Sequence, residues 1–242
     1  MAIDFEFLEE FDRKQVMIVD DDAFMLGVLE KLLNLLGIER VLRAENGQQA
    51  RSLLDGHAVD LVITDVQMPE LDGLSLLKLI RTNQTAAAHN LPVIVVTSLE
   101  DEKTLAQALS LDVNGFVQKP FKAPLLIKRA LVAMSEAFHE APGFPYREVV
   151  IDPEGLVIEG GAVRSKTSHD DQRIPRERSE RLTVVSLFQL RPDMQLAEDI
   201  KTKTGTVLLS RGFTLNEARV HRMWELEDNL EKTSFKIIGG WS

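Results

Sequence analysis

The chain has 242 residues, contains no cysteine and carries a formal net charge of −10. The length favours two domains of ordinary size, and the lack of cysteine excludes disulfides and thiolate metal sites. The acidic balance disfavours non-specific binding to nucleic acid, and no apolar run is long enough to cross a membrane. The acidic N-terminal stretch lacks the basic flank and apolar core of a secretory signal, so we expect a cytoplasmic protein.

The first half of the sequence alternates short β-rich runs with segments of helical periodicity. Three runs, VMIVD at 16–20, LVITD at 61–65 and VIVVT at 93–97, are nearly continuous in apolar residues. Such runs are typical of strands buried on both faces of a parallel sheet. Two more amphipathic runs, at 41–45 and 115–119, predict strands nearer the sheet edges.

Helical periodicity follows each of these runs. The predicted helices cover residues 24–36, 48–54, 74–81, 103–109 and 124–138. Five successive β–α units imply right-handed crossovers and a sheet that is covered on both faces. The predicted fold is therefore a doubly wound α/β domain with a five-stranded parallel sheet.

The pattern changes near residue 139, where the segment HEAPGFPY carries two prolines and a glycine that end the last predicted helix. Residues 149–158 predict a hairpin around an Asp-Pro-Glu-Gly turn. The polar, charged stretch at 164–181 predicts a flexible linker or an exposed loop. We therefore divide the chain into a first domain with a short acidic N-terminal extension, a hairpin with linker, and a second domain, at residues 1–140, 141–181 and 182–242.

Short strand candidates return after the linker and predict a small β-rich α+β domain. The candidates are LTVVSLFQL, LAEDI, TVLLS and the run at 235–238. Thr214 or Asn216 can cap a helix that runs to about Asp228. The predicted core comprises Leu196, Ile200, Val207, Leu209, Phe213 and Leu215, with Met223 and Trp224 packing over it from the helix.

Charged and hydroxyl side chains stand at the ends of four predicted strands in the first domain. They are Asp20-Asp21-Asp22, Asp65, Thr97-Ser98 and Lys119-Pro120. The carboxyl ends of parallel strands meet at one edge of an open α/β sheet, where ligands collect. Several carboxylates at one edge repel each other unless a hard cation lies among them, and Mg²⁺ prefers oxygen ligands.

This combination of residues suits phosphoryl transfer. A carboxylate beside Mg²⁺ can accept a phosphoryl group, because the metal neutralises charge on the transferring group. A hydroxyl and an ammonium on the other side can hold the remaining phosphoryl oxygens. An acidic run after a strand is most often a solvated loop, and only the occurrence of all four features at successive strand ends favours a site.

The segments that carry these residues resemble those of response-regulator receiver domains. They read VMIVDDDA, LVITDVQMPELDG, VIVVTS and GFVQKPF, and the resemblance covers residues 15 to 139 or so. It implies the flavodoxin-like receiver fold and phosphorylation of Asp65. One departure is the segment at 82–90, which is longer than expected and predicts a surface bulge.

The resemblance also implies a role for each residue of the set. The expected Mg²⁺ ligands are Asp20, Asp21, Asp65 and the backbone carbonyl of Gln67. The expected phosphoryl-binding and switch residues are Thr97, Ser98, Phe116 and Lys119. The expected phosphodonor is a sensor histidine kinase or a phosphotransfer protein. The helices at 103–109 and 124–138 are the expected face for dimerisation or partner docking.

The sequence of the second domain gives little support for DNA binding or for phosphodiesterase activity. A helix-turn-helix DNA reader needs a basic recognition helix, whereas the one strong predicted helix, at 216–228, is acidic toward its end. A metal-dependent phosphodiesterase needs clustered histidines and aspartates. Its only candidate dyad, His169-Asp170, falls in the polar linker.

A cyclic-dinucleotide binder of the PilZ kind begins with paired arginines before a β-barrel. Four arginines precede LTVVSL, at positions 173, 176, 178 and 181. Their spacing does not fit the pattern, and no Asp-x-Ser-x-x-Gly follows. A solvated linker is the simpler interpretation, and a ligand-binding output remains the leading alternative.

The strongest resemblance in the second half lies at residues 185–226. Leu190–Met194, Leu196–Ile200 and Gly205–Leu209 are similar to L-x-P-G-M-x-L-A-x-D-I … G-x-L-L-L, a pattern of the small β-rich module beside HD-GYP cyclic-di-GMP phosphodiesterases. No HD or GYP catalytic motif follows these residues in the sequence. The resemblance therefore implies a fold and not an activity.

Taken with the first domain, these observations predict a two-domain response regulator that is not itself an enzyme. We expect its second domain to act through phosphorylation-gated contact with a downstream signalling protein or through formation of a homodimer. The alternatives are binding of a cyclic dinucleotide or other ligand and, less favoured, DNA binding by a transcription regulator. No membrane partner is expected.

Overall fold

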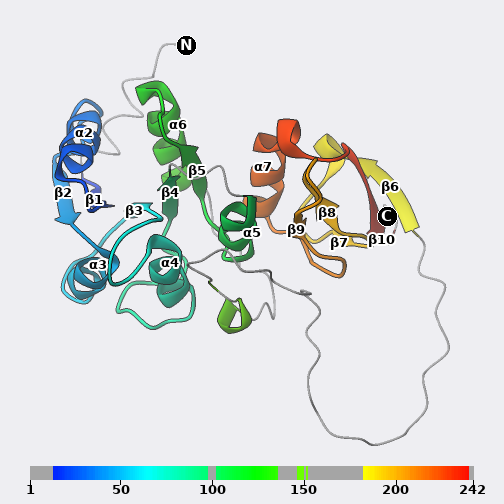
Figure 1. Cartoon of the computed structure of the whole chain (residues 1–242), viewed down its shortest axis with the longest axis horizontal. Helices are drawn as coiled ribbons and strands as arrows, with labels where there is room; N and C mark the ends of the chain where they lie inside the picture. The colour runs from blue at the N-terminus through cyan, green and yellow to red at the C-terminus, as the bar shows by residue number, and fades with distance from the viewer. Residues whose placement is uncertain (1–12, 98–101, 136–145, 150, 152–181, 240–242) are drawn as a thin grey trace, which may run out of the picture. The chain divides into compact units, whose positions relative to one another are not determined.

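The computed structural model describes residues 13–97, 102–135, 146–149, 151 and 182–239. The chain forms two compact units, Met1–Pro153 and Glu154–Ser242 (Figure 1). In the described ranges, every helix is too short or too polar to cross a membrane.

The first unit is built on a five-stranded parallel sheet with strand order β2-β1-β3-β4-β5. The strands are β1 (Gln15–Val19), β2 (Arg40–Ala44), β3 (Leu61–Asp65), β4 (Val93–Thr97) and β5 (Gly115–Gln118). Two of them match their predicted bounds, and the other three differ by one residue. The order reverses between β1 and β3, which is the point where ligands bind in open α/β sheets. The predicted doubly wound fold is confirmed.

A helix follows each strand of this sheet. The helices are α2 (Ala23–Asn34), α3 (Gly47–Leu54), α4 (Gly73–Arg81), α5 (Glu102–Ser110) and α6 (Ala123–Ser135). Asp22, Asn46 and Asp72 start α2, α3 and α4 by accepting hydrogen bonds from backbone amides of the first turn. The end predicted for the last helix, at residue 138, lies outside the described residues.

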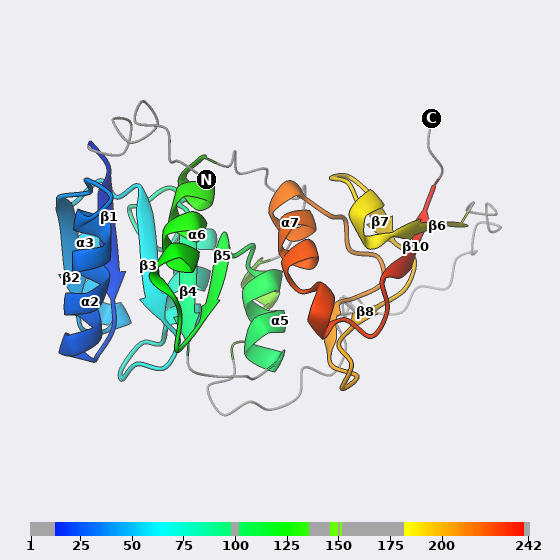
Figure 2. The same ribbon diagram turned by 90° about the horizontal axis from the view of Figure 1, so that it is seen from above.

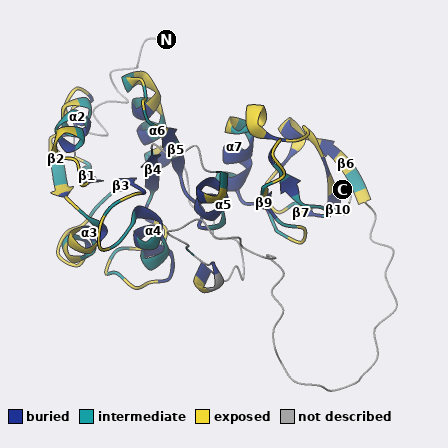
Figure 3. Cartoon of the chain, viewed as in Figure 1, coloured by how far each residue is buried: buried dark blue, intermediate teal, exposed yellow. Residues whose placement is uncertain are grey.

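The sheet has a hydrophobic core on each face, because successive strand residues point to opposite sides. In β1, Met17 and Val19 pack with residues of α3 and α4, whereas Val16 and Ile18 pack with residues of α2 and α6. Figure 1 shows the two helix pairs on opposite faces, and Figure 2 views the sheet from the side of α2 and α6. The central strands are buried between them (Figure 3), which explains their continuous apolar sequences.

The long segment before β4 lies largely at the surface, as predicted for residues 82–90. Asp55, at the end of α3, accepts a hydrogen bond from the Ala86 amide at 3.0 Å. The Arg81 guanidinium, at the end of α4, donates to the His89 carbonyl at 2.7 Å. The loop is therefore tied to two helices and leaves the neighbouring strand undisturbed.

The first unit extends past the boundary predicted at residue 140. A short 3-10 turn, η1 (Tyr146–Glu148), and Val149 contribute to the same core cluster as α3 and α4. Only residues 149 and 151 of the predicted hairpin are described. The predicted linker at 164–181 lies outside the described residues.

The described part of the second unit, residues 182–239, contains two small antiparallel sheets and one α-helix. Strands β6 (Leu182–Ser186), β10 (Ser234–Ile238) and β7 (Gln195–Leu196) form one sheet in that order, and β8 (Ile200–Lys201) pairs with β9 (Val207–Leu209). The helix is α7 (Glu217–Glu225), and 3-10 turns follow β6 and α7 as η2 (Leu187–Gln189) and η3 (Glu227–Asn229). A small β-rich unit was predicted here.

Several predicted elements of this unit are shorter than expected. The strand predicted at LTVVSLFQL ends at Ser186, because the Gln189 side chain accepts a hydrogen bond from the Ser186 amide and closes η2. The strand predicted at LAEDI is divided, since Leu196 and Ile200 belong to different sheets. The predicted helix ends at Glu225 instead of residue 228.

Most of the predicted core residues of the second unit are buried and Phe213 is half-buried, but Val207 is exposed. Its side chain is 37% exposed, and Leu208 and Leu209 occupy the interior instead. A register shift in the pairing of β8 with β9 disturbs the alternation that the prediction assumed. Trp224 is half-buried, and its indole N–H donates to the Leu187 carbonyl at 2.9 Å, which supports a structural role.

Candidate functional site

Two carboxylates lie side by side where the strand order reverses. Asp20 follows β1, and its amide donates to the Ala44 carbonyl of β2 at 3.1 Å, so the residue continues the sheet pairing. Asp65 is the last residue of β3. Asp20 is 1% exposed and Asp65 is 8% exposed, so both carboxylates are largely removed from water.

The loop after β3 fixes one oxygen of Asp65. Oδ1 accepts a hydrogen bond from the Val66 amide at 2.7 Å, which leaves Oδ2 for other partners. The loop after Asp65 then closes on itself, because the Gly73 amide donates a hydrogen bond to the Val66 carbonyl at 3.0 Å. A Cβ at Gly73 would stand 1.9 Å from the Asp65 carbonyl oxygen, so this close return requires glycine.

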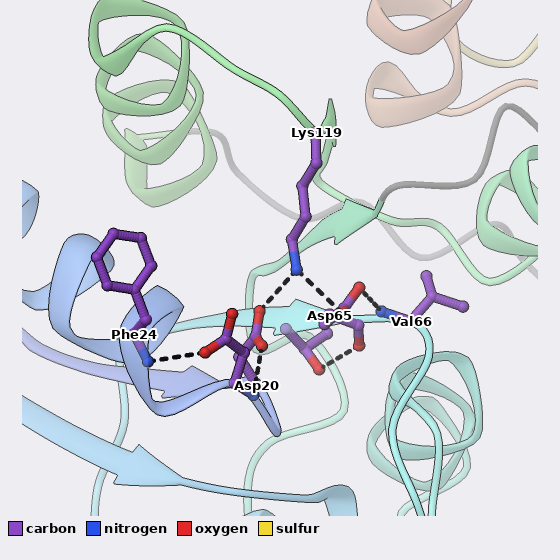
Figure 4. Close-up of polar contacts among 7 residues, drawn as sticks. Asp20, Phe24, Asp65, Val66 and Lys119 are labelled. Carbon is purple, nitrogen blue, oxygen red and sulfur yellow. Dashed lines mark hydrogen bonds and ion pairs between the residues drawn. The ribbon is translucent and has the colours of Figure 1, made fainter.

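Lys119 bridges the two carboxylates (Figure 4). Its ammonium Nζ lies 2.7 Å from Asp20 Oδ2 and 3.1 Å from Asp65 Oδ2. Its backbone amide donates to the Thr97 carbonyl at 2.7 Å, and a cis peptide bond joins it to Pro120. Residues that are 99 and 54 positions apart in the chain are thus brought into one cluster.

The electrostatics of the cluster show a surplus of negative charge. Burial raises the pKa of the Asp65 carboxyl, Lys119 offsets part of this effect, and Asp20 adds to it. Burial also disfavours the charged form of Lys119, but its hydrogen bonds to Asp20 and Asp65 outweigh that effect and raise its pKa. One ammonium therefore holds two buried carboxylates without neutralising both.

These carboxylates are suited to holding a divalent cation. Ligand oxygens of Asp20, Asp21 and Asp65 all lie within 4.8 Å of one another, and Asp21 is exposed to solvent. An all-oxygen set with surplus negative charge fits a hard cation such as Mg²⁺. Asp22 takes no place in the set; it starts α2 by accepting a hydrogen bond from the Phe24 amide at 2.8 Å.

The structure describes three of the four remaining residues of the predicted set. Thr97 is fully buried at the end of β4. Phe116 lies on β5, partly buried against the core cluster shared by α3 and α4. Gln67 is exposed in the loop after Asp65, and its carbonyl as a metal ligand stays a prediction. Ser98 lies outside the described residues.

Some contributors to the site were not predicted from the sequence. The Val66 amide orients Asp65, and the Ala44 carbonyl positions Asp20. The Thr64 hydroxyl donates to the Asp65 carbonyl at 2.9 Å. The two backbone groups could not be predicted, because any residue type supplies an amide and a carbonyl. Gly73 belongs to the motif LVITDVQMPELDG, but its close approach to the Asp65 carbonyl could not be predicted from the sequence.

Residues 16–131 match the response regulator receiver domain. The chemotaxis protein CheY1 of Helicobacter pylori is 35% identical over 118 residues, which are 48% of this chain and 93% of CheY1. The chain belongs to the response-regulator receiver family. Receiver domains bind Mg²⁺ at an acidic pocket, and the receiver of this chain has such a cluster in Asp20, Asp21 and Asp65.

Other similar proteins align with the same half of the chain. CheY of Pseudomonas aeruginosa is 33% identical over 112 residues, which are 46% of this chain and 89% of CheY. A solved structure titled as the receiver of an HD domain-containing protein from Pseudomonas fluorescens is 28% identical, with a TM-score of 0.47, over 50% of this chain and 94% of that one. These similarities concern the receiver and not the second unit.

Proposed function

We propose that the chain is a two-component response regulator that accepts a phosphoryl group on Asp65 from a histidine kinase or a phosphotransfer protein. The observation that carries this proposal is the placement of Asp65 beside Asp20 with Lys119 bridging both. Family membership supports it, because receivers are the phosphoryl-accepting partners of two-component signalling.

The orientation of Asp65 suits it to attack phosphorus. Because the Val66 amide holds Oδ1, Oδ2 is the oxygen presented toward Lys119 and available as nucleophile. When Oδ2 attacks a phosphohistidine, a P–O bond forms, the P–N bond breaks, and its electron pair returns to the imidazole nitrogen, which takes up a proton. Mg²⁺ held by Asp20, Asp21 and Asp65 would neutralise charge on the transferring group.

Lys119 is placed to stabilise the product. Its ammonium reaches Asp65 Oδ2 already, so it can follow the phosphoryl oxygens and hold their charge. Phosphorylation adds roughly −1.5 to −2 charges at this point. We infer that Thr97 and Phe116 respond to that charge, and that α5 and β5 shift as a two-state element.

The second unit serves, in this proposal, as a non-catalytic output that contacts another protein or a second copy of the chain. Its relation to the module beside HD-GYP phosphodiesterases is part of the proposal. Asp193 supports that relation: it stands where the quoted pattern has glycine, and its φ of 68° is the left-handed conformation that favours glycine. The backbone at this position thus adopts the conformation that glycine favours, although the residue is an aspartate.

The phosphoacceptor role is tested by incubating the full chain with Mg²⁺ and acetyl phosphate and following its intact mass. We expect the mass of one phosphoryl group to be added to the wild type and not to Asp65→Asn. Equal labelling of both proteins would place the acceptor elsewhere.

The output role is tested by affinity capture from native lysate with beryllofluoride and Mg²⁺, with Asp65→Asn as control. A protein retained only by the activated wild type supports a protein-interaction output. Binding of a cyclic dinucleotide in calorimetry, without any state-dependent protein, would favour the ligand-binding alternative.

A further inference from the structure

The chain returns to the receiver after its last helix, on the opposite face of the sheet. Helix α6 packs in the core cluster that it shares with α2. Tyr146 and Val149, which follow it in sequence, pack in the other cluster, with α3 and α4. The two ends of the intervening segment therefore lie on different faces of the sheet, and the chain does not leave the receiver where α6 ends.

Residues 146–149 and 151, named here the docking segment, make specific contacts on this face. Tyr146 is 5% exposed, and its hydroxyl donates a hydrogen bond to the Asp112 carboxylate. The Val149 carbonyl accepts a hydrogen bond from Lys78 Nζ on α4 at 2.6 Å. Val149 is 9% exposed, and Ile151 packs partly against the same cluster. Apolar burial thus combines with two polar contacts that fix the position of the segment.

The surface that receives the segment is formed by α4 and the turn between α5 and β5. Asp112 lies in that turn with a φ of 51° and is 1% exposed. Beside it, the buried Arg81 guanidinium donates to the carbonyls of Leu111 and Asp112, both at 3.0 Å. These hydrogen bonds hold the turn that carries the acceptor of the Tyr146 hydroxyl in place.

This surface shares its hydrophobic cluster with residues that follow Asp65 in the chain and with Phe116. Phe116, Met68 and Val66 contact the same hydrophobic cluster as Tyr146, and so do Ala108 and Leu111 at the end of α5. A movement of α5 or of the Phe116 ring therefore changes the packing against which the docking segment lies.

We propose that the surface formed by α4 and the α5–β5 turn is an internal docking site for the docking segment, and that phosphorylation of Asp65 changes how firmly the segment is bound there. The chain continues from this segment into the second unit, which begins at Glu154. Release or tightening of the segment is then the step that reaches the output unit. The second half of this proposal rests on the proposed function; the docking itself does not.

The chain offers a direct probe, because Tyr146 is its only tyrosine. Full-length protein labelled with 3-fluorotyrosine gives a single tyrosine resonance in fluorine NMR. Docking predicts that this resonance differs from its position in urea-unfolded protein. Lys78→Met, which removes the donor to Val149 and keeps the apolar stem, should move it toward the unfolded position. The matched control is Lys31→Met, on the exposed side of α2 on the other face, which should leave it unchanged.

The effect of activation is read in the same spectra after addition of beryllofluoride and Mg²⁺. Protein-bound beryllofluoride has its own fluorine signals, which report occupancy of Asp65. We expect the tyrosine resonance to move in the wild type and to stay in place in Asp65→Asn.

Three outcomes separate the claims. A wild-type tyrosine resonance at the unfolded position overturns the docking site. If the resonance lies at the docked position and does not move when beryllofluoride binds, the coupling is refuted and the proposed function stands. Failure of beryllofluoride to bind and of acetyl phosphate to label Asp65 counts against the proposed function itself, and the comparison of Lys78→Met with Lys31→Met still decides the docking.

Discussion

The two ends of the receiver sheet each bury a charged cluster, and the two clusters differ in how fully their charges are matched. Before β4 and β5, the Arg81 guanidinium donates to backbone carbonyls of the surrounding turns and to the Asn114 side chain. After β1 and β3, Lys119 faces two carboxylates at once. In the Arg81 cluster, groups of the protein itself accept the hydrogen bonds of the guanidinium. The Lys119 cluster carries surplus negative charge.

This difference separates a structural cluster from a binding site. Burial lowers the pKa of Arg81 to about 10, with Asp112 and Tyr146 opposing the shift, so the guanidinium stays charged at neutral pH. Its hydrogen-bond acceptors are all groups of the protein and not of a ligand. At the other end, burial raises the pKa of Asp65 by more than Lys119 lowers it, so the ionised carboxylate is not fully compensated by the protein. Such a site gains stability from a cation or from a change in its own charge.

The largest effect is expected at the Arg81 cluster, from Arg81→Met. Removing the guanidinium leaves several buried carbonyl groups without their donor, and we expect the free energy of unfolding of the receiver to fall by about 3–5 kcal/mol. Urea denaturation followed by far-UV circular dichroism measures the loss. Arg40→Met, at an exposed position of β2, is the control. A loss no greater than that of the control would show that Arg81 is not structural.

The next effect concerns the close return of the chain behind Asp65. In Gly73→Ala the new methyl group meets the Asp65 carbonyl, so the loop must move. We expect a loss of about 1–3 kcal/mol in stability and slower labelling of Asp65 by acetyl phosphate. Gly27→Ala is a matched control, because a Cβ there meets nothing within 4 Å and alanine favours the helix. Normal labelling of Gly73→Ala would contradict the requirement for glycine.

A smaller effect of opposite sign is expected from Asp65→Asn. The raised pKa means that the ionised carboxylate is penalised in the folded state. Without Mg²⁺ at neutral pH, the free energy of unfolding of the variant should therefore exceed that of the wild type by on the order of 1 kcal/mol. This advantage should shrink as the pH falls through the raised pKa, because the wild-type carboxyl becomes neutral. Thermal unfolding in EDTA at several pH values measures it, and a variant less stable than the wild type would refute the surplus of negative charge.

The smallest effect is expected at a surface pair in the second unit, where charges are matched in water. Burial acts against ionisation of Glu198, but its hydrogen bonds to Lys232 and the Lys236 amide outweigh burial and lower its pKa. The resulting stability is present above the pKa of the unfolded chain and is lost as the pH falls through the lower folded pKa. Glu198→Gln should cost about 0.2–1 kcal/mol at pH 7, and less in acid. A loss that is unchanged in acid would exclude an ionic origin.

The receiver was predicted from sequence almost to the residue because its signals are local. Runs such as LVITD mark strands buried on both faces, and their last residues carry the chemistry to one sheet edge. Spacing along the chain then implies that Asp20, Asp65 and Lys119 meet, as the structure shows. The roles of individual site residues, including the Gln67 carbonyl, stay predictions.

The rest could not be predicted, because it depends on contacts between distant residues. Strands β7 and β8 are two residues long, and a two-residue strand has no periodicity that a sequence can display. The exposure of Val207 follows from a shift in strand register. The hydrogen bond between Tyr146 and Asp112 joins residues 34 positions apart, and neither residue belongs to a recognisable motif.

The return of the chain to the α4 face bears on how such a receiver can be exchanged between proteins. A recombination that joined a new output domain directly after α6 would discard Tyr146 and leave the Asp112 carboxylate without its phenol partner. Part of the apolar surface that Val149 covers would then face water. A junction placed after residue 151 keeps that surface closed. The receiver and the few residues that fold back on it therefore form the unit that recombination has to transfer whole. A new output domain is best joined after residue 151.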